Sequence, residues 1–272
     1  MINKEISAQK SIIETKNRDI TDSIQYAKNI QEAILPQLEV ISQEFPQSFI
    51  LYMPKDIVSG DFYWFAKRKN KKFLATADCT GHGVPGAFMS IIGNTILNEI
   101  VAEKEILQPG EILNELHAGI KNALKQSNAE GERRDGMDIA LCAIEDGSNI
   151  LEYAGANRPL WIFRGGAPDK MEVIKPDKFP IGGLEMEEKR RFTNIRLELG
   201  KGDMIYLSSD GYADQFGGHA GKKMMVKNFQ KLLTEILHLP VNEQKEILRN
   251  HFINWKGDQE QVDDVLVIGF RF

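Results

Sequence analysis

The feature that most constrains the fold is a set of short strand-like runs, most of which follow the preceding run directly, without a helix between them. Such runs are rich in β-branched and aromatic residues and are bounded by turn residues. They lie in residues 48–54, 61–68, 72–79, 137–145, 149–155, 159–165, 171–175, 191–199, 203–209 and 263–272. Two pairs of helix-like segments interrupt these runs. The first pair covers about 85–104 and 109–127, and the second covers about 222–237 and 241–254. Consecutive strands pair antiparallel and paired helices lie on sheet faces, so the pattern predicts an α+β domain.

Residues 1–35 form a separate segment that contains no glycine or proline. An apolar residue recurs there every seven positions, which predicts one helix with a single apolar stripe. The stripe consists of Ile6, Ile13, Ile20, Ala27 and Ile34, and the second seam position holds Lys10, Asn17, Ile24 and Gln31. This mostly polar second position predicts a weak, parallel two-helix coiled coil and a homodimer through residues 1–35. The alternative is a helix that packs on its own domain. In either case Pro36 ends the helix near Leu35.

The composition of the chain excludes several classes of protein. It is 42% hydrophobic and 27% charged, an ordinary globular balance, and its net charge of -5 argues against nucleic-acid binding, which needs a basic face. Cys79 and Cys142 lie in apolar runs and are expected to be buried free thiols, as in a reducing cytoplasm. The N-terminus lacks the apolar core of a signal peptide. No apolar stretch is expected to approach the ~18 residues that span a bilayer.

Four aspartates stand at the ends of strand-like runs, beside glycine or turn residues. They are Asp61, Asp78, Asp210 and Asp263, with Asp264 directly after the last. Burying an unpaired carboxylate is costly, and several that converge repel one another unless a cation lies between them. Oxygen ligands favour Mg²⁺ or Mn²⁺. Two such ions can lower the pKa of a shared water and orient it for attack on phosphorus.

Taken singly, these motifs are weak evidence for a site. An Asp-Gly pair after a strand, as at Asp210, is more often a turn. The glycines on either side of His82 suggest by themselves only a tight loop, and a lone loop histidine is more often hydrogen-bonded than a metal ligand. The joint occurrence of the motifs, in this order and in these contexts, is far more specific.

In that order the motifs resemble those of the PPM-type, or protein phosphatase 2C-like, metal-dependent protein phosphatases. The branch is that of stage II sporulation protein E and the sigma-B regulator phosphatases. The resemblance covers about residues 45–272. It rests on Ser-Gly-Asp-Phe-Tyr (59–63), Ala-Asp-Cys-Thr-Gly-His-Gly-Val-Pro-Gly-Ala (77–87), Tyr-Ala-Gly-Ala-Asn-Arg-Pro (153–159), Phe-Pro-Ile-Gly (179–182), Ser-Ser-Asp-Gly (208–211) and Asp-Asp-Val (263–265).

The resemblance implies a four-layer α-β-β-α sandwich of two antiparallel sheets with flanking helices over residues 45–272, preceded by a helical signalling segment over residues 1–40. It also implies two metal ions, Mn²⁺ or Mg²⁺, with a third as an option. The implied catalytic and metal-binding residues are Asp61, Asp78, Asp210 and Asp263, together with the backbone carbonyl of Cys79. Asp78 bridges both ions in this pattern, and Asp264 is a weaker candidate.

The sequence departs from the family pattern at three positions. Trp64 stands where many members have a second acidic residue, Ala156 where many have histidine, and Asp138 where a hydroxyl or apolar residue is common. Trp64 is expected to be a packing or surface residue. Asp138 is expected to be an ordinary strand-end residue, with an approach to the metal centre as the alternative.

No arginine in the pattern is dedicated to the phosphate. Arg158, Arg133 and Arg134 are candidates only, because exposed arginines usually face solvent.

The expected activity is hydrolysis of phosphoserine or phosphothreonine on a cytoplasmic signalling protein of the anti-sigma-factor antagonist type. An upstream sensor domain or protein is expected to act through residues 1–35. The alternative, from a different class, is a non-catalytic scaffold of the same fold that binds phosphoproteins.

Overall fold

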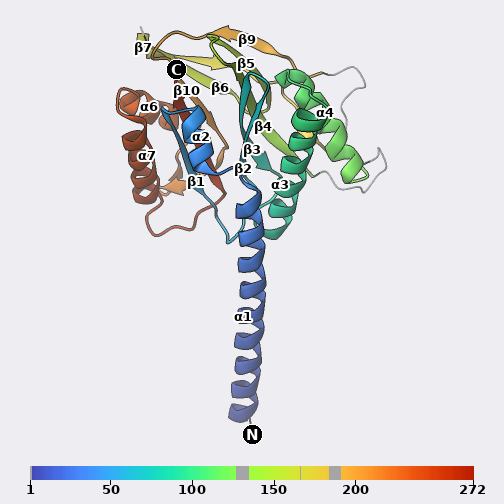
Figure 1. Ribbon diagram of the computed structural model, residues 1–272. Helices are drawn as coiled ribbons and strands as arrows, with labels where there is room; N and C mark the ends of the chain where they lie inside the picture. The colour runs from blue at the N-terminus through green and yellow to red at the C-terminus, as the bar shows by residue number, and fades with distance from the viewer. Residues whose placement is uncertain (1, 127–134, 166, 184–190) are drawn as a thin grey trace.

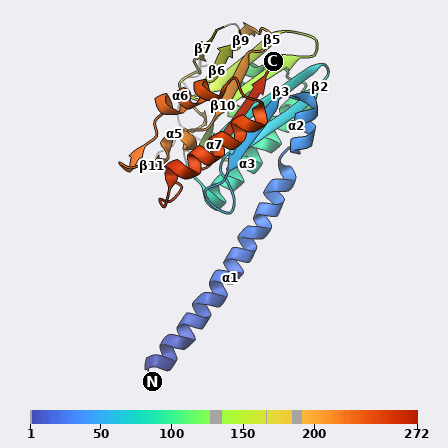
Figure 2. The same cartoon turned by 90° about the vertical axis from the view of Figure 1, so that its left-hand side faces the viewer.

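Two antiparallel sheets pack face to face and helices cover both outer faces, which gives four layers (Figures 1 and 2). The computed structural model describes residues 2–126, 135–165, 167–183 and 191–272. The predicted α+β sandwich is confirmed. Arg133 and Arg134, two of the phosphate candidates, lie outside the described residues.

Each sheet is built from strands that are distant in the sequence. The first sheet has the order β1 (Ser48–Met53), β13 (Val265–Arg271), β10 (Met204–Ser208), β6 (Leu160–Arg164) and β7 (Ala167–Ile174). The second has the order β2 (Phe62–Arg68), β3 (Lys71–Cys79), β4 (Gly136–Glu145), β5 (Ile150–Ala156) and β9 (Ile195–Glu198), and β8 (Ile181–Gly182) also pairs with β4. In this order β13 lies between β1 and β10, so the last strand joins early and late parts of the chain.

The helices divide between the two outer faces. On the second sheet lie α3 (Gly83–Asn98), the π-helix η1 (Glu99–Glu103) and α4 (Pro109–Ala123), and on the first lie α6 (Val226–Ile236) and α7 (Val241–Lys256). Two short helices, α2 (Leu38–Glu44) and α5 (Gly211–Asp214), were not predicted. The helix predicted from about residue 222 begins at Val226 instead, because β12 (Lys222–Lys223) forms a small hairpin with β11 (Phe216–Gly217).

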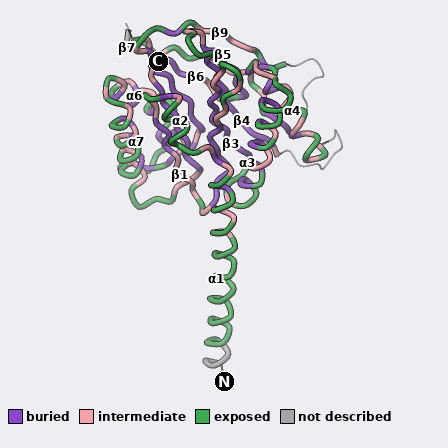
Figure 3. The backbone as a smooth tube through the Cα atoms, in the orientation of Figure 1, coloured by how far each residue is buried: buried purple, intermediate pink, exposed green. Residues whose placement is uncertain are grey.

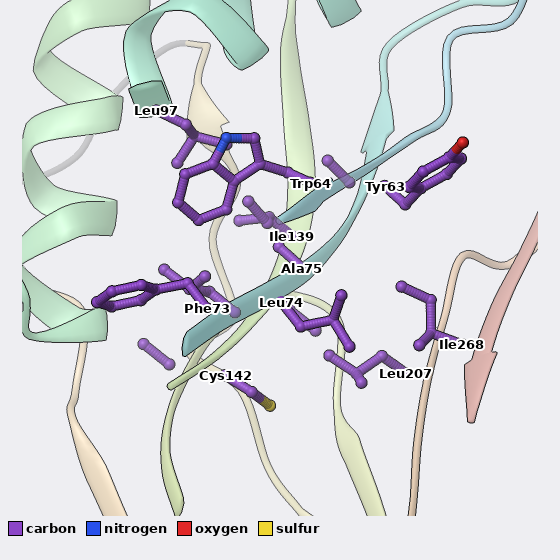
Figure 4. Packing of buried hydrophobic residues seen from close by; sticks show 14 of the residues in the cluster. Tyr63, Trp64, Phe73, Leu74, Ala75, Leu97, Ile139, Cys142, Leu207 and Ile268 are labelled. Atoms are coloured by element: carbon purple, nitrogen blue, oxygen red, sulfur yellow. The ribbon is translucent and has the colours of Figure 1, made fainter. Parts of the chain in front are cut away.

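The core fills the space between the sheets and the space beneath the helices. In Figure 4, Leu74 of β3 lies beside Leu207 and Ile268 of the opposite sheet. Trp64 is fully buried, and its indole nitrogen donates a hydrogen bond of 2.9 Å to the side-chain oxygen of Asn98. Trp64 is therefore a packing residue. Its hydrogen-bonded indole satisfies the polar group that an aromatic side chain brings into a core.

The helix α1 (Ile2–Ile34) ends before Pro36 as predicted, and it projects away from the sheets as one long rod (Figures 1 and 3). Ile6, Ile13 and Ile20 are exposed by 56%, 59% and 57%. The stripe predicted for a partner helix is thus open to solvent in the single chain. The division of the chain at residues 1–40 and 45–272 stays a prediction.

The last turns of α1 pack on the domain, and there one prediction was wrong. Gln31, expected at a coiled-coil seam, is only 4% exposed. Its amide nitrogen donates to the carbonyl of Ser59 (2.7 Å) and to the hydroxyl of Ser90 (2.8 Å), and its oxygen accepts from the amide of Ser59 (3.1 Å). Gln31 therefore connects α1 to α3 and to the loop before β2. This agrees with the alternative prediction, in which the helix packs on its own domain.

The segment Gly83–Glu103, formed by α3 and η1, is long and apolar enough by length and composition to cross a membrane. The expectation that no stretch is long and apolar enough to span a bilayer was therefore wrong for this segment. Half of the most apolar window is buried inside the domain, where Met89 and Leu97 join the core. A helix buried in a core needs an apolar sequence for the same reason that a membrane helix does.

Candidate active site

The topology brings the four predicted aspartates to one edge of the sandwich. Asp61 immediately precedes β2 and Asp78 lies near the end of β3, its antiparallel partner. Asp210 follows β10, and Asp263 precedes β13, which pairs antiparallel with β10. Where one antiparallel strand ends its neighbour begins, so each pair of aspartates shares an end of two adjacent strands.

A cavity of about 260 Å³ opens at this edge. Three of the four predicted aspartates line it, namely Asp78, Asp210 and Asp263, and so does Cys79. Asp138, expected to be an ordinary strand-end residue, also lines the cavity, because the β3–β4 register places it directly opposite Asp78. The structure therefore agrees with the alternative prediction for Asp138, in which this residue approaches the candidate metal centre.

Asp61 does not line the cavity and is only 2% exposed. Its Oδ2 atom is buried and finds no hydrogen-bond partner within the described residues. Burial, followed by the nearby charge of Asp78, raises the pKa of the Asp61 carboxyl well above its ordinary value. An unpartnered buried carboxylate oxygen leaves one ligand position available to a cation.

The carboxyl groups of Asp78, Asp138 and Asp263 at the cavity also have raised pKa values, because they are partly buried and lie near one another. Burial raises the pKa of Asp78 to about 7; Asp210, Asp263 and Asp138 add to the rise, and Arg158 opposes it. Burial is also the main cause that raises the pKa of Asp138 and of Asp263. Each shift arises because a negative charge is costly at this place, and a bound cation would remove that cost.

Glycines let three backbone segments meet beside these carboxylates. A Cβ atom on Gly60 or on Gly86 would collide with the carbonyl oxygen of Gly81. Gly81 itself has a φ of +85°, in the left-handed region that favours glycine. The loop before β2, the loop after β3 and the first turn of α3 are consequently fixed against one another.

Asp264, the weaker ligand candidate, holds the loop before β2 in place. Its Oδ1 accepts a hydrogen bond from the backbone amide of Lys55 and its Oδ2 accepts one from the amide of Gly60, each of 2.7 Å. Both carboxylate oxygens are therefore already used. The residue positions Asp61 through its loop.

A short chain of polar side chains lies at the rim of the cavity. His82 lines the cavity, and its Nδ1 lies 2.6 Å from a carboxylate oxygen of Asp56. Its Nε2 lies 2.9 Å from the ammonium of Lys55. His82 is thus a hydrogen-bonded loop histidine, as expected. Within the described ranges no carboxylate lies at ion-pair distance from Lys55, so most of its hydrogen-bonding capacity is free.

The Phe-Pro-Ile-Gly stretch also borders the cavity. Pro180 lines the cavity, and the amide of Gly182 donates a hydrogen bond of 3.0 Å to Nδ1 of His117 on α4. Burial, followed by the charge of Lys121, lowers the pKa of His117. A neutral His117 therefore anchors this wall of the cavity to the helix layer.

Arg158 is one residue whose position could not be predicted from the sequence. It was treated as an exposed arginine, but its side chain is only 15% exposed and contacts carboxylates of the site. The only signal in the sequence was its place in the Tyr-Ala-Gly-Ala-Asn-Arg-Pro stretch.

The donor set fits a hard divalent cation, although the carboxylates are held slightly apart. In the described part of the chain no three His, Cys, Asp or Glu side chains converge closely enough to hold a metal by themselves. The unpartnered Oδ2 of Asp61, the raised pKa values and the all-oxygen set of aspartates nevertheless match the ligands that Mg²⁺ and Mn²⁺ prefer. Both cysteines are buried free thiols, as expected.

The fold and this arrangement of aspartates define a protein phosphatase 2C-type domain. The family model of Stage II sporulation protein E (SpoIIE) matches residues 69–272, and the chain belongs to this family.

Two known proteins resemble the chain in particular. Phosphoserine phosphatase RsbU of Bacillus subtilis (strain 168) is 25% identical over 198 residues, which are 72% of this chain and 55% of RsbU. The chain thus spans about half the length of this relative. The SiaA-PP2C domain of Pseudomonas aeruginosa is 29% identical, and the match covers 94% of this chain and 98% of that domain with a TM-score of 0.82. RsbX, solved in complex with magnesium, shares the fold at 14% identity and a TM-score of 0.57, over 83% of this chain and 94% of RsbX.

Proposed function

We propose that the chain is a metal-dependent protein serine/threonine phosphatase. The observation that carries the proposal is the cavity at the ends of β3 and β10, where partly buried aspartates lie together and one buried carboxylate oxygen of Asp61 has no partner among the described residues. Bound cations stabilise such a group of carboxylates, and phosphoryl transfer needs cations at the same place. The relative RsbU is a phosphoserine phosphatase and RsbX binds magnesium, which supports this assignment.

Two ions, Mn²⁺ or Mg²⁺, would be held by Asp61, Asp78, Asp210 and Asp263 and by the carbonyl of Cys79. When bound, they supply a water of lowered pKa and polarise the phosphoryl group. The aspartates of this chain would orient the ions, and the carboxylate of Asp61 is itself shielded from bulk water.

At the rim, the ammonium of Lys55 binds the phosphoryl oxygens of the substrate. Lys55 is oriented by His82: when Asp56 accepts from Nδ1 of the imidazole, Nε2 is left as an acceptor for the ammonium. The remaining donors of Lys55 point to no carboxylate within the described ranges and are available to an anion. This role was not found from the sequence, where only arginines were considered.

The proposed substrate is phosphoserine or phosphothreonine on a cytoplasmic signalling protein of the anti-sigma-factor antagonist type. We also propose that α1 pairs with a second copy of the chain and receives a signal from an upstream sensor domain or protein. The exposed stripe of Ile6, Ile13 and Ile20 supports the pairing.

The test is phosphate release from phosphoserine and phosphothreonine peptides by the purified chain with Mn²⁺, with Mg²⁺ and with EDTA. Release should require a metal and should be absent for a phosphotyrosine peptide. If the chain binds phosphopeptides but releases no phosphate with either metal, the scaffold alternative holds instead.

A further inference from the structure

The Tyr-Ala-Gly-Ala-Asn-Arg-Pro stretch after β5 is folded so that it delivers one arginine to the site. The hydroxyl of Tyr153 donates a hydrogen bond of 2.6 Å to the carbonyl of Arg158. Gly155 leaves room for this turn, because a Cβ atom there would lie 2.6 Å from the same carbonyl. Asn157 has a φ of +56°, an unusual conformation for a residue other than glycine.

The end of this loop meets three carboxylates at once. One terminal nitrogen of Arg158 lies 2.6 Å from Asp210, 2.8 Å from Asp78 and 3.3 Å from Asp138. Asn157 donates a hydrogen bond of 2.8 Å to the other oxygen of Asp138. Arg158 does not itself line the cavity, whereas the three carboxylates that it contacts do.

The strand register explains why a cation is needed there. Asp78 and Asp138 are directly opposite each other on β3 and β4. Like charges in that relation destabilise a sheet, because their Cβ atoms are only ~5 Å apart. Within the described part of the chain Arg158 is the one cation in contact with either aspartate. The departure from the family pattern at Asp138 and the arginine at 158 thus belong to one cluster, in which a single positive charge contacts three carboxylates.

We propose that Arg158 is a built-in cation that takes the place of a divalent ion at Asp138, so that the site holds two metal ions and not three. An arginine keeps its charge at every physiological pH and its planar group reaches several carboxylates. It pairs with Asp138 and positions Asp78 and Asp210, its two nearer contacts, for the two ions. Arg158 is a positioning residue, and its role rests on the proposed metal-dependent function.

The experiment counts the Mn²⁺ ions bound per chain, by isothermal titration calorimetry and by electron paramagnetic resonance of free Mn²⁺. Wild type is compared with Arg158→Gln, Asp138→Asn and the double variant. Arg164→Gln is the matched control, because Arg164 also pairs with carboxylates, at 2.9 Å from Glu172 and 2.7 Å from Asp203, but lies elsewhere. Thermal unfolding is measured with and without Mn²⁺.

Wild type, the Arg164→Gln control, Asp138→Asn and the double variant should each bind two ions. Arg158→Gln should bind one more, because Asp138 becomes free, and should gain more in melting temperature from Mn²⁺ than wild type does. Three ions in wild type, or an unchanged count in a folded Arg158→Gln, would overturn the proposal. A count of three in wild type overturns the proposal even where Arg158→Gln does not fold. Wild type that binds no Mn²⁺ would instead defeat the proposed function itself.

Discussion

Charge at single side chains decides most of what this site can do. Asp61, Asp78, Asp138 and Asp263 all have carboxyl pKa values raised chiefly by burial. Arg158 is the fixed positive charge that opposes this for Asp78 and Asp138. The site is consequently tuned by a few residues that act on one another, and a change at one of them is felt by the others.

The variant Asp78→Asn should lower metal-dependent phosphate release by at least about 100-fold, because a neutral amide cannot hold cations as a carboxylate does. The fold should be kept, since removal of one buried charge relieves repulsion among the remaining carboxylates. Circular dichroism and Mn²⁺-dependent hydrolysis of a phosphoserine peptide measure the two effects.

Asp214→Asn is the matched control for that variant. Asp214 lies four residues from Asp210 but pairs with Lys223 at 2.8 Å. Its activity should stay near that of wild type. Near-normal turnover in a folded Asp78→Asn chain would contradict the proposed site.

Hydrolysis should resist thiol alkylation and be lost in EDTA. Cys79 and Cys142 are 5% and 2% exposed, and burial raises the pKa of both thiols, so neither is a reactive thiolate. Activity on a phosphoserine peptide after iodoacetamide treatment, with and without chelator, is the measurement. Loss on alkylation combined with survival in EDTA would reverse the mechanism.

Whole elements are held at the cavity by a small number of specific contacts. The loop before β2 is fixed by Asp264 and by the close packing of Gly60 on the carbonyl of Gly81. On the other side, α4 holds the wall that contains Pro180 and Gly182 through His117. Each contact fixes a segment that borders the candidate site to another part of the domain.

The anchor of α4 should make stability sensitive to mild acid. His117 has a pKa lowered from the ordinary 6.5, so the folded state resists its protonation while the unfolded chain accepts the proton. The contribution of neutral His117 to the free energy of unfolding is complete above pH 6.5. It is lost as the pH falls through 6.5 toward the lower pKa of the folded state. A protonated Nδ1 also cannot accept from the amide of Gly182.

Urea unfolding of wild type and His117→Asn between pH 5 and pH 7.5 measures this effect. Asparagine is smaller than histidine, so the variant should lose roughly 1 kcal/mol or more of unfolding free energy at neutral pH. Because asparagine keeps an acceptor but does not titrate, the stability of the variant should fall less steeply with acid. Equal slopes for the two proteins would show that His117 does not cause the acid sensitivity.

At the scale of the whole molecule, α1 is a long helix attached to the domain at one end (Figure 2). Its last turns are fixed by Gln31, which contacts both Ser59, two residues before Asp61, and Ser90 of α3. Its first turns expose an apolar stripe. Burial of one isoleucine contributes ~1.5–3 kcal/mol at best, and Lys10 and Asn17 subtract from this in a paired helix.

The full chain should therefore dimerise weakly, with a concentration dependence at tens of micromolar, and a truncation to residues 40–272 should be monomeric. Sedimentation velocity of both proteins, with Mn²⁺-dependent rates at several concentrations, is the measurement. Replacing Ile13 and Ile20 by serine in the full chain keeps Gln31 and is the control for loss of the stripe alone. Monomers with equal rates for full chain and truncation would contradict the dimer.

The sequence by itself determined the class of fold and the positions of the aspartates. Strand period, helix period and the aspartates at strand ends are local features, readable because side chains alternate or repeat along one element. The tertiary structure decided which of these residues meet. Arg158 reaches Asp78 across 80 positions, and Gln31 reaches Ser90 across 59. Such partners depend on strand register and on packing of distant segments, which no local pattern encodes.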